Sequence, residues 1–168
     1  MAFTDLARGA CQQSARCGEW GSQKMNLETT GGRSPLVLLV DPAITSRHLM
    51  WRALSRAFGV LEASSADAAR TWIARRPDID ALVIQDELPD QRGVEFVQDL
   101  VATRHPVARR AIVQAKMSPD GAVVAQAGLT LIERGDLRAV SLKLASWLLV
   151  RDAGLTKALM REVERLGA

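Results

Sequence analysis

The chain has 168 residues, of which 48% are hydrophobic and 24% charged, and its formal net charge is +3. This length suits one domain with appendages, and the composition is that of an ordinary globular protein, which argues against disorder. Apolar runs are far shorter than the roughly 20 residues that cross a bilayer, the N-terminus lacks a secretory pattern, and basic residues are interspersed with acidic ones. We therefore expect a cytoplasmic protein that spans no membrane and binds no nucleic acid.

The first 34 residues are rich in Gly, Ser, Gln and Thr and show no sustained apolar period. This composition predicts a flexible N-terminal arm over 1–34. Both cysteines of the chain, Cys11 and Cys17, lie in it without a nearby histidine, so a metal site is not expected. They are interpreted as free, reduced thiols, with a redox-sensing disulfide as the alternative.

Strand and helix patterns alternate from Leu36 onward. Short unbroken apolar runs, typical of strands buried on both faces of a parallel sheet, are separated by segments with a helical period. Ser64 and Ser65 can cap one of the helices. The predicted elements, in chain order, are a strand at 36–40, a helix at 44–58, a strand at 60–63, a helix at 66–75, a strand at 81–84, a helix at 94–103, a strand at 111–114, a helix at 121–127, a strand at 129–132 and a helix at 137–150.

The C-terminal segment, 151–168, carries one more helical pattern, with an apolar stripe. A short isolated helix is marginal in water, so this stripe must be buried. It can fold back on the domain, continue the preceding helix, or pair with another copy of the chain. We favour a homodimer that uses this helix together with the last two helices of the domain. The stripe consists of Leu155, Leu159, Val163 and Leu166.

Five strands alternating with five helices predict an α/β domain over 35–150, a doubly wound, five-stranded parallel sheet with strand order 2-1-3-4-5. In such a sheet the strand order reverses between the first and third strands, and ligands gather beyond the carboxyl ends of these strands. This geometry is expected to bring Asp41, after the first strand, close to Gln85 and Asp86, at the end of the third.

Two segments are distinctive: Leu38 to Ile44, which contains Asp41-Pro42, and Asp80 to Phe96, with its apolar run, proline-containing loop and glycine. Together they resemble the receiver domains of bacterial two-component response regulators, and Phe58 to Ala63 is similar to receivers of hydrogenase-type and HD-GYP-type regulators. The resemblance implies an aspartate at the end of the third strand that accepts a phosphoryl group. It also implies a magnesium ion held by acids after the first strand, a hydroxyl after the fourth strand and a lysine after the fifth.

The acceptor position departs from this pattern. Counting back from Pro89 without gaps places Gln85 there, and glutamine neither forms an acyl phosphate nor offers magnesium a carboxylate. A one-residue deletion in the loop would instead place Asp86 at the acceptor position. Both alignments stay open at this point.

The rest of the implied pocket is also incomplete. Asp41 is present, but Pro42 stands where the family usually has a second acid, and a single carboxylate holds magnesium weakly. Ala115 takes the hydroxyl position, with Lys116 next to it and Ser118 slightly beyond.

No Lys-Pro pair follows the predicted fifth strand. Arg134 is the nearest cation, although Glu133 takes that place if the register shifts by one residue. We hypothesise that Arg134 pairs with Asp41 across the pocket and replaces the missing lysine, whereas the alternative roles for Asp41 are a helix cap or a partner of Lys116. The acids Asp86, Glu87 and Asp90 are expected to lie in a solvated loop.

These departures favour a degenerate receiver, or pseudo-receiver, in a two-component phosphorelay. Such a module is not an enzyme, needs no cofactor, and acts by binding a signalling protein such as a histidine kinase or a regulator. The alternative is a working receiver in which Asp86 accepts a phosphoryl group from a histidine kinase with the assistance of magnesium and Asp41.

Overall fold

The computed structural model describes residues 33–116, 129–150 and 153–167. The predicted arm therefore lies outside the described residues except for its last two positions, and so do Cys11, Cys17, Ser118 and the predicted helix at 121–127. The elements are β1 (Leu36–Val40), α1 (Ile44–Leu54), β2 (Gly59–Ala63), α2 (Ala66–Arg75), β3 (Ala81–Gln85), α3 (Gly93–Ala102), the 3-10 helix η1 (Pro106–Arg110), β4 (Ala111–Ala115), β5 (Thr130–Glu133), α4 (Leu137–Leu148) and α5 (Ala153–Gly167).

The five strands form one parallel sheet in the order β2-β1-β3-β4-β5, so the predicted topology is confirmed. Every residue of β1, β3 and β4 is buried, as expected for strands covered by helices on both faces. The register pairs Gln85 on β3 with Gln114 on β4, next to the carboxyl ends of both strands.

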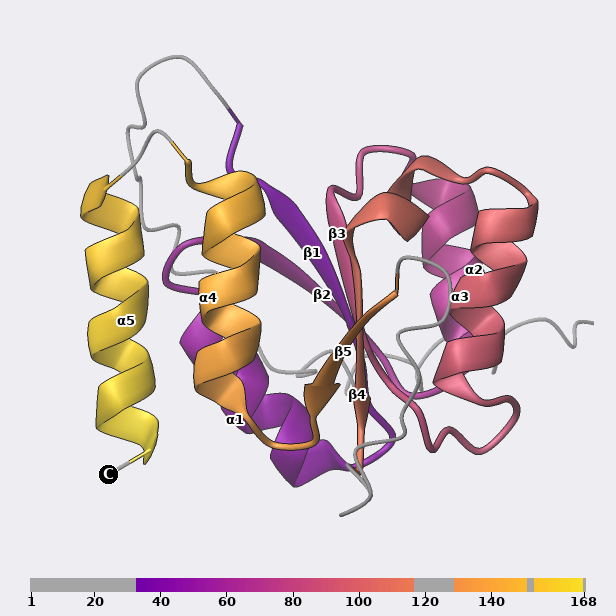
Figure 1. Ribbon diagram of the computed structural model, residues 1–168, viewed down its shortest axis with the longest axis horizontal. Coiled ribbons are helices and arrows are strands. Elements are labelled where there is room, and N and C mark those ends of the chain that lie inside the picture. The colour runs from indigo at the N-terminus through magenta and orange to yellow at the C-terminus, as the bar shows by residue number, and fades with distance from the viewer. Residues whose placement is uncertain (1–32, 117–128, 151–152, 168) are drawn as a thin grey trace, which may run out of the picture. The chain divides into compact units, whose positions relative to one another are not determined.

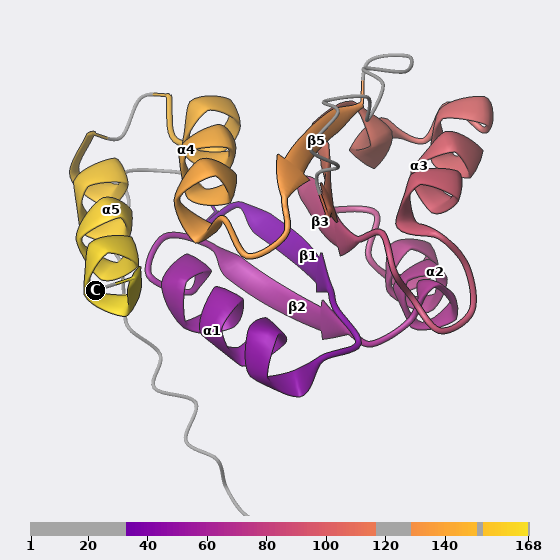
Figure 2. The same cartoon turned by 60° about the horizontal axis from the view of Figure 1, so that its bottom comes forward.

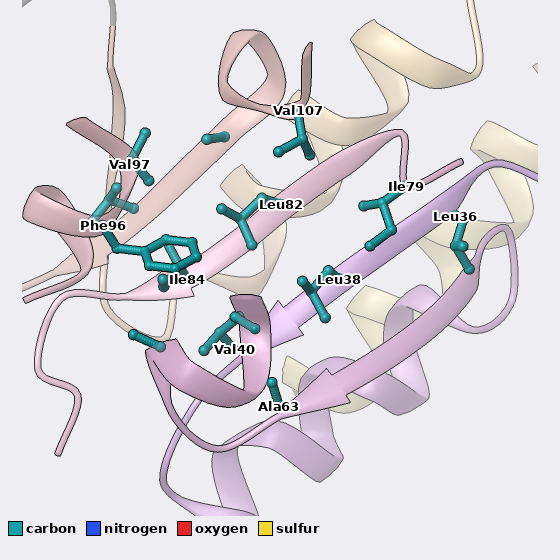
Figure 3. Close-up of a cluster of buried hydrophobic side chains, with 14 residues drawn as sticks. Leu36, Leu38, Val40, Ala63, Ile79, Leu82, Ile84, Phe96, Val97 and Val107 are labelled. Carbon is teal, nitrogen blue, oxygen red and sulfur yellow. The ribbon is translucent and has the colours of Figure 1, made fainter. Parts of the chain in front are cut away.

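Helices α1, α4 and α5 lie on one side of the sheet, and α2 and α3 on the other (Figures 1 and 2). Side chains of β1 alternate between the two resulting cores, because successive residues of a strand point to opposite faces. Leu38 and Val40 join the core under α2 and α3, together with Phe96 (Figure 3). Val37 and Leu39 join the core under α1, α4 and α5. The unbroken apolar run of β1 therefore serves both cores.

Two predicted segments differ from the structure. Helix α1 ends at Leu54, four residues before the predicted end, although Ala57 and Phe58 remain buried. The apolar period there reflected burial and not a continuing helix. The second is 106–110, where no helix was predicted: Pro106 opens η1, and the His105 ring caps its first turn by accepting from the Val107 N–H at 3.3 Å.

The C-terminal helix α5 folds back on its own domain and packs beside α4 (Figure 2) and against α1. Its apolar stripe is covered there, with Leu159 fully buried and Val163 nearly so. Glu162, beside the stripe, pairs with Arg165 and with Arg56, and the hydrogen bond from Arg165 lowers the pKa of Glu162. Because the stripe is buried within the chain, homodimerisation stays a prediction that this helix no longer supports.

Across the three described ranges, no helix combines the length and the apolar character needed to cross a membrane.

Candidate functional site

The carboxyl ends of β1 and β3 meet at a buried contact between Asp41 and Gln85. The Gln85 Nε2 donates to Asp41 Oδ2 at 3.0 Å, and both residues are only 1% exposed. The topology thus brings together the two positions that the sequence placed at the crevice.

The other partners of the Asp41 carboxylate lie at the start of α1. Its Oδ1 accepts from the Ala43 N–H at 2.8 Å, and its Oδ2 also accepts from the Ser46 hydroxyl at 2.5 Å. Ala43, at the N-cap position, makes no side-chain capping bond itself, so Asp41 organises this turn from two residues upstream. Both carboxylate oxygens are therefore occupied by neutral donors. The hypothesis that Arg134 pairs with Asp41 is wrong, because Arg134 bonds Glu87 instead.

Asp86 is buried and fastens the loop between β3 and α3. One carboxylate oxygen accepts from the Val94 N–H at 3.0 Å, and the other pairs with Arg92. The backbone N–H of Asp86 donates to the Gln114 carbonyl, and its own carbonyl accepts from the Gly93 N–H, each at 2.9 Å. The hydrogen bond to Asp86 raises the pKa of the Arg92 guanidinium. The expectation of a solvated Asp86 is wrong, because its carboxylate is an internal anchor that is 6% exposed.

Gly93 allows this loop to lie directly against the end of β3. A Cβ at position 93 would lie 2.2 Å from the Gln85 carbonyl oxygen, a separation that a side chain cannot adopt. The glycine that the sequence placed at the start of this helix is therefore required by the close approach of two backbone segments.

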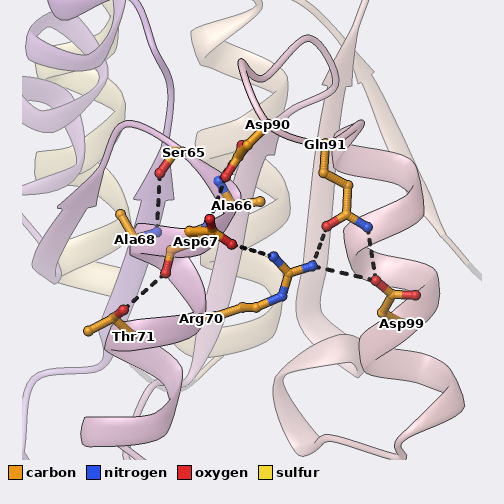
Figure 4. A network of polar contacts seen from close by, with 9 residues as sticks. All are labelled: Ser65, Ala66, Asp67, Ala68, Arg70, Thr71, Asp90, Gln91 and Asp99. Carbon is orange, nitrogen blue, oxygen red and sulfur yellow. Dashed lines mark hydrogen bonds and ion pairs between the residues drawn. The ribbon is translucent and has the colours of Figure 1, made fainter.

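Asp90 connects the same loop to α2 (Figure 4). Its two carboxylate oxygens accept from the N–H groups of Ala66 and Asp67, at 2.9 and 2.8 Å. Partial burial would raise the pKa of Asp90, but these two hydrogen bonds lower it below its usual value. Ser65 caps the same helix end by accepting from the Ala68 N–H at 3.1 Å, as predicted. Asp90 is thus exposed in the loop, as expected from the sequence, and in addition caps a distant helix.

Arg70 continues this network between the loop and α3. It donates to Asp67 at 2.9 Å and to the side-chain oxygen of Gln91. The Gln91 Nε2 in turn donates to Asp99 on α3 at 2.9 Å (Figure 4). The β3–α3 loop is consequently held at both ends and by both neighbouring helices.

A pocket of about 180 Å³ opens beyond the ends of β3, β4 and β5. At its mouth the Glu87 carboxylate receives Arg134 at 2.9 Å and Lys116 at 3.6 Å. Its described lining contains five of the predicted site residues, whereas Asp41 and Pro42 lie outside it. The described lining residues are Gln85, Asp86, Glu87, Arg92, Val94, Gln114, Ala115, Lys116 and Arg134.

Three polar residues of this pocket, Glu87, Arg92 and Gln114, were not recognised as site residues from the sequence. The signal for Gln114 was present, because both β3 (ALVIQ) and β4 (AIVQA) carry a single glutamine near the end of an otherwise apolar strand. For Glu87 and Arg92 the sequence offered no distinguishing signal, since charged residues are common in loops.

The donor set at the crevice does not fit the magnesium ion that the receiver resemblance implies. Magnesium requires a nearly octahedral set of oxygens that includes one or two free carboxylates. Asp41 is engaged by neutral donors, Asp86 by Arg92 and a backbone N–H, and Gln85 turns its NH₂ group toward Asp41. Within the residues that the structure describes, no three His, Cys, Asp or Glu side chains are grouped as metal ligands.

Comparison with known proteins gives one partial sequence match. No family model matches the chain. The hydrogenase transcriptional regulatory protein HoxA of Cupriavidus necator is 35% identical over 77 residues, which is 46% of this chain but only 16% of HoxA.

Several solved structures share the fold. The signal receiver domain of a Luxo repressor protein from Vibrio parahaemolyticus has a TM-score of 0.60 at 18% identity, covering 79% of this chain and 98% of that one. The signal receiver domain of an HD domain-containing protein from Pseudomonas fluorescens has a TM-score of 0.59 at 21% identity. The match covers 70% of this chain and 97% of that one. A CheY-like response regulator receiver domain from Methylobacillus flagellatus has a TM-score of 0.58 at 19% identity. The match covers 68% of this chain and 98% of that one. At these identities the likeness shows the fold, which is that of receiver domains.

Proposed function

We propose that this chain, which has the receiver fold, is a pseudo-receiver of a two-component signalling system. It takes no phosphoryl group, is not an enzyme, uses no cofactor, and acts in the cytoplasm by binding a signalling protein such as a histidine kinase or a regulator. The observation that carries the proposal is the buried bond from Gln85 to Asp41 at 3.0 Å. It places a neutral amide at the end of β3 and occupies the carboxylate that would otherwise be available to a metal ion.

A second observation supports a module whose loops favour one conformation. The Glu87 carboxylate lies between Lys116, which follows β4, and Arg134, which follows β5. Glu87 itself follows β3, so its two ion pairs connect the segments that follow β3, β4 and β5. These pairs are largely exposed and individually weak, so they bias the loop conformation without locking it. A partner protein would then read this conformation directly.

The alternative function, a phosphoacceptor at Asp86, has one observation in its favour. Asp86 is a carboxylate next to Gln85 at the carboxyl edge of the sheet. To accept a phosphoryl group it would have to free one carboxylate oxygen from Arg92 or from the Val94 N–H, and the β3–α3 loop would lose part of its anchor.

Incubation of the full chain with acetyl phosphate and magnesium, followed by intact mass spectrometry, tests the proposal. We expect no phosphoryl adduct on the wild type or on the Asp86→Asn variant. The matched control is Glu87→Gln, which removes the neighbouring carboxylate and leaves Asp86 in place. An adduct that forms on the wild type and on Glu87→Gln but is lost in Asp86→Asn would overturn the proposal in favour of the alternative.

A further inference from the structure

The segment 104–110, between α3 and β4, carries three arginines and no acid. It consists of Arg-His-Pro-Val-Ala-Arg-Arg, and the sequence has no acidic residue from Leu100 to Pro119. This differs from the mixed charges that the sequence shows overall. Because η1 leads into the amino end of β4 and all five strands are parallel, the segment lies at the edge of the sheet opposite the crevice.

The backbone of this segment is fixed by its own hydrogen bonds. The Arg104 N–H donates to the Val101 carbonyl at 2.9 Å, and the His105 N–H donates to the Leu100 carbonyl at 2.8 Å. The His105 ring accepts from the Val107 N–H at 3.3 Å. Val107 belongs to the core under α2 and α3 (Figure 3), where it is 2% exposed. The segment is therefore ordered before any partner binds, which lowers the entropy cost of binding.

The three arginines are not used within the domain. Among the described residues, Arg104, Arg109 and Arg110 are exposed, and their side chains make no ion pair or hydrogen bond. Other arginines already bind Asp78 and Asp80, the acids that precede β3 at the same edge of the sheet. Three positive charges at this edge are therefore available to a partner.

Arg104 adopts a backbone conformation that favours glycine. Its φ is 54°, and it is the single non-glycine residue with a positive φ in the described ranges. A residue with a Cβ is strained in this conformation because the Cβ approaches the following carbonyl oxygen. No bond from the Arg104 side chain to another described residue offsets the strain. Backbone outliers of this kind are concentrated at functional sites, so the strain is a second indication that this surface binds a partner.

Exposed apolar side chains adjoin the arginines and indicate the kind of partner. Val101, three residues before Arg104, is 45% exposed, and Pro106 is exposed as well. Guanidinium groups bind carboxylates through paired hydrogen bonds, and exposed apolar side chains favour a protein over a phosphate backbone. Three arginines are also few for nucleic acid, which proteins bind by neutralising many phosphates. An acidic protein segment with apolar residues therefore fits this surface best.

We propose that Arg104, Arg109 and Arg110 dock an acidic segment of a partner protein. Carboxylates of the segment pair with the three guanidinium groups, and an apolar side chain of the segment covers Val101. The surface lies opposite the crevice and shares no residue with it. The inference therefore goes beyond the proposed function and does not depend on whether Asp86 accepts a phosphoryl group.

The experiment is a titration of the ¹⁵N-labelled full chain with two synthetic peptides at constant ionic strength. One peptide contains glutamate and leucine, and the other has serine in place of each leucine. Fluorescence anisotropy of the labelled peptides measures affinity, and backbone amide shifts locate the bound surface. We expect saturable binding with shifts concentrated in residues 100–111, and tighter binding of the leucine peptide.

Variants with equal loss of charge separate this surface from the general charge of the protein. Arg109→Gln combined with Arg110→Gln should weaken binding of the leucine peptide about fivefold, since each exposed charge pair contributes modestly. The matched control combines Arg138→Gln with Arg161→Gln, on α4 and α5, two exposed arginines that also lack an ion pair among the described residues. This control should keep the wild-type affinity. Val101→Ser should weaken binding of the leucine peptide and leave that of the serine peptide unchanged.

Arg104→Gly separates binding from folding. Glycine adopts the φ of this position without strain, so the variant should have a thermal unfolding midpoint at least as high as that of the wild type. It should nevertheless bind the leucine peptide more weakly, because one guanidinium group is lost. Unchanged affinity in this variant would remove Arg104 from the surface and contradict the inference.

Equal losses of affinity in the two double variants would overturn the inference, since net charge alone would then explain binding. Absence of saturable binding by both peptides would overturn it as well. Tighter binding of duplex DNA than of either peptide, lost when Arg109 and Arg110 are replaced, would overturn the choice of a protein partner. None of these outcomes involves a phosphoryl adduct, so they are distinct from the result that would overturn the pseudo-receiver proposal.

Discussion

The two halves of the carboxyl edge of the sheet differ in how completely their buried polar groups are paired. Between β1 and β3, both oxygens of Asp41 are matched to donors from Ala43, Ser46 and Gln85. Between β3 and β4, the oxygen of the same Gln85 and the amide nitrogen of Gln114 have no partner. Asp41 is therefore a structural anchor, whereas the amides between β3 and β4 keep unpaired buried groups. A buried carboxylate at a family's functional position is not by itself a functional group.

The largest effect that this comparison predicts follows from Asp41→Ala. The change leaves the Gln85 NH₂, the Ser46 hydroxyl and the Ala43 N–H without their acceptor, and should lower the free energy of unfolding by about 3 kcal/mol. Urea denaturation measures it. Asp41→Asn, which keeps one acceptor oxygen, should lower the free energy of unfolding by less than Asp41→Ala does. A gain in stability for Asp41→Ala would contradict the anchoring role, because it is the result expected when one acid is removed from a repulsive metal site.

A somewhat smaller loss is expected from Gly93→Ala, which tests whether the β3–α3 loop holds the two halves together. The added Cβ would meet the Gln85 carbonyl at 2.2 Å and force the loop away, at a cost of about 2 kcal/mol. Gly135→Ala is the matched control: its φ of +88° is strained for alanine, but no atom lies within 4 Å of the new Cβ, so about 1 kcal/mol is expected. Equal losses at both positions in thermal denaturation would refute the close approach.

Gln114→Met should change stability in the direction opposite to Asp41→Ala. Removing an unpaired buried donor relieves a desolvation penalty, so stability should stay within about 1 kcal/mol of the wild type or rise. The urea denaturation used for Asp41 measures this change too. A loss comparable to that of Asp41→Ala would mean that Gln114 is also a structural anchor.

The smallest effect is expected at the opposite edge of the sheet, where Asp78 precedes β3. Its hydrogen bonds from Arg76 lower the pKa of Asp78 from 3.8 to about 2. Because the folded pKa lies below the unfolded one, the stabilisation is present above pH about 4 and is lost as the pH falls through about 2. Asp78→Asn should remove this slight dependence from acid denaturation curves, since an exposed pair contributes little. A steep acid dependence that survives in the variant would place the responsible carboxylate elsewhere.

Strand positions, sheet order and the meeting of Asp41 with Gln85 could be predicted because they depend on apolar runs and on the regular geometry of parallel sheets. Partner choice could not, as Arg134 illustrates: its partner Glu87 lies 47 residues earlier in the chain, and only the positions of the loops select that acid. Asp90 illustrates the same limit, since it caps a helix that begins 24 residues earlier. The fold-back of α5 was one of three alternatives because an apolar stripe predicts burial without specifying the covering surface.

Urea denaturation of the wild type with and without millimolar magnesium distinguishes an anchoring Asp41 from a metal ligand. A ligand that binds only the folded state shifts the midpoint upward as its concentration rises. We expect the same midpoint in both conditions for the wild type and for Asp41→Asn. A magnesium-dependent rise in the wild type that disappears in Asp41→Asn would contradict it.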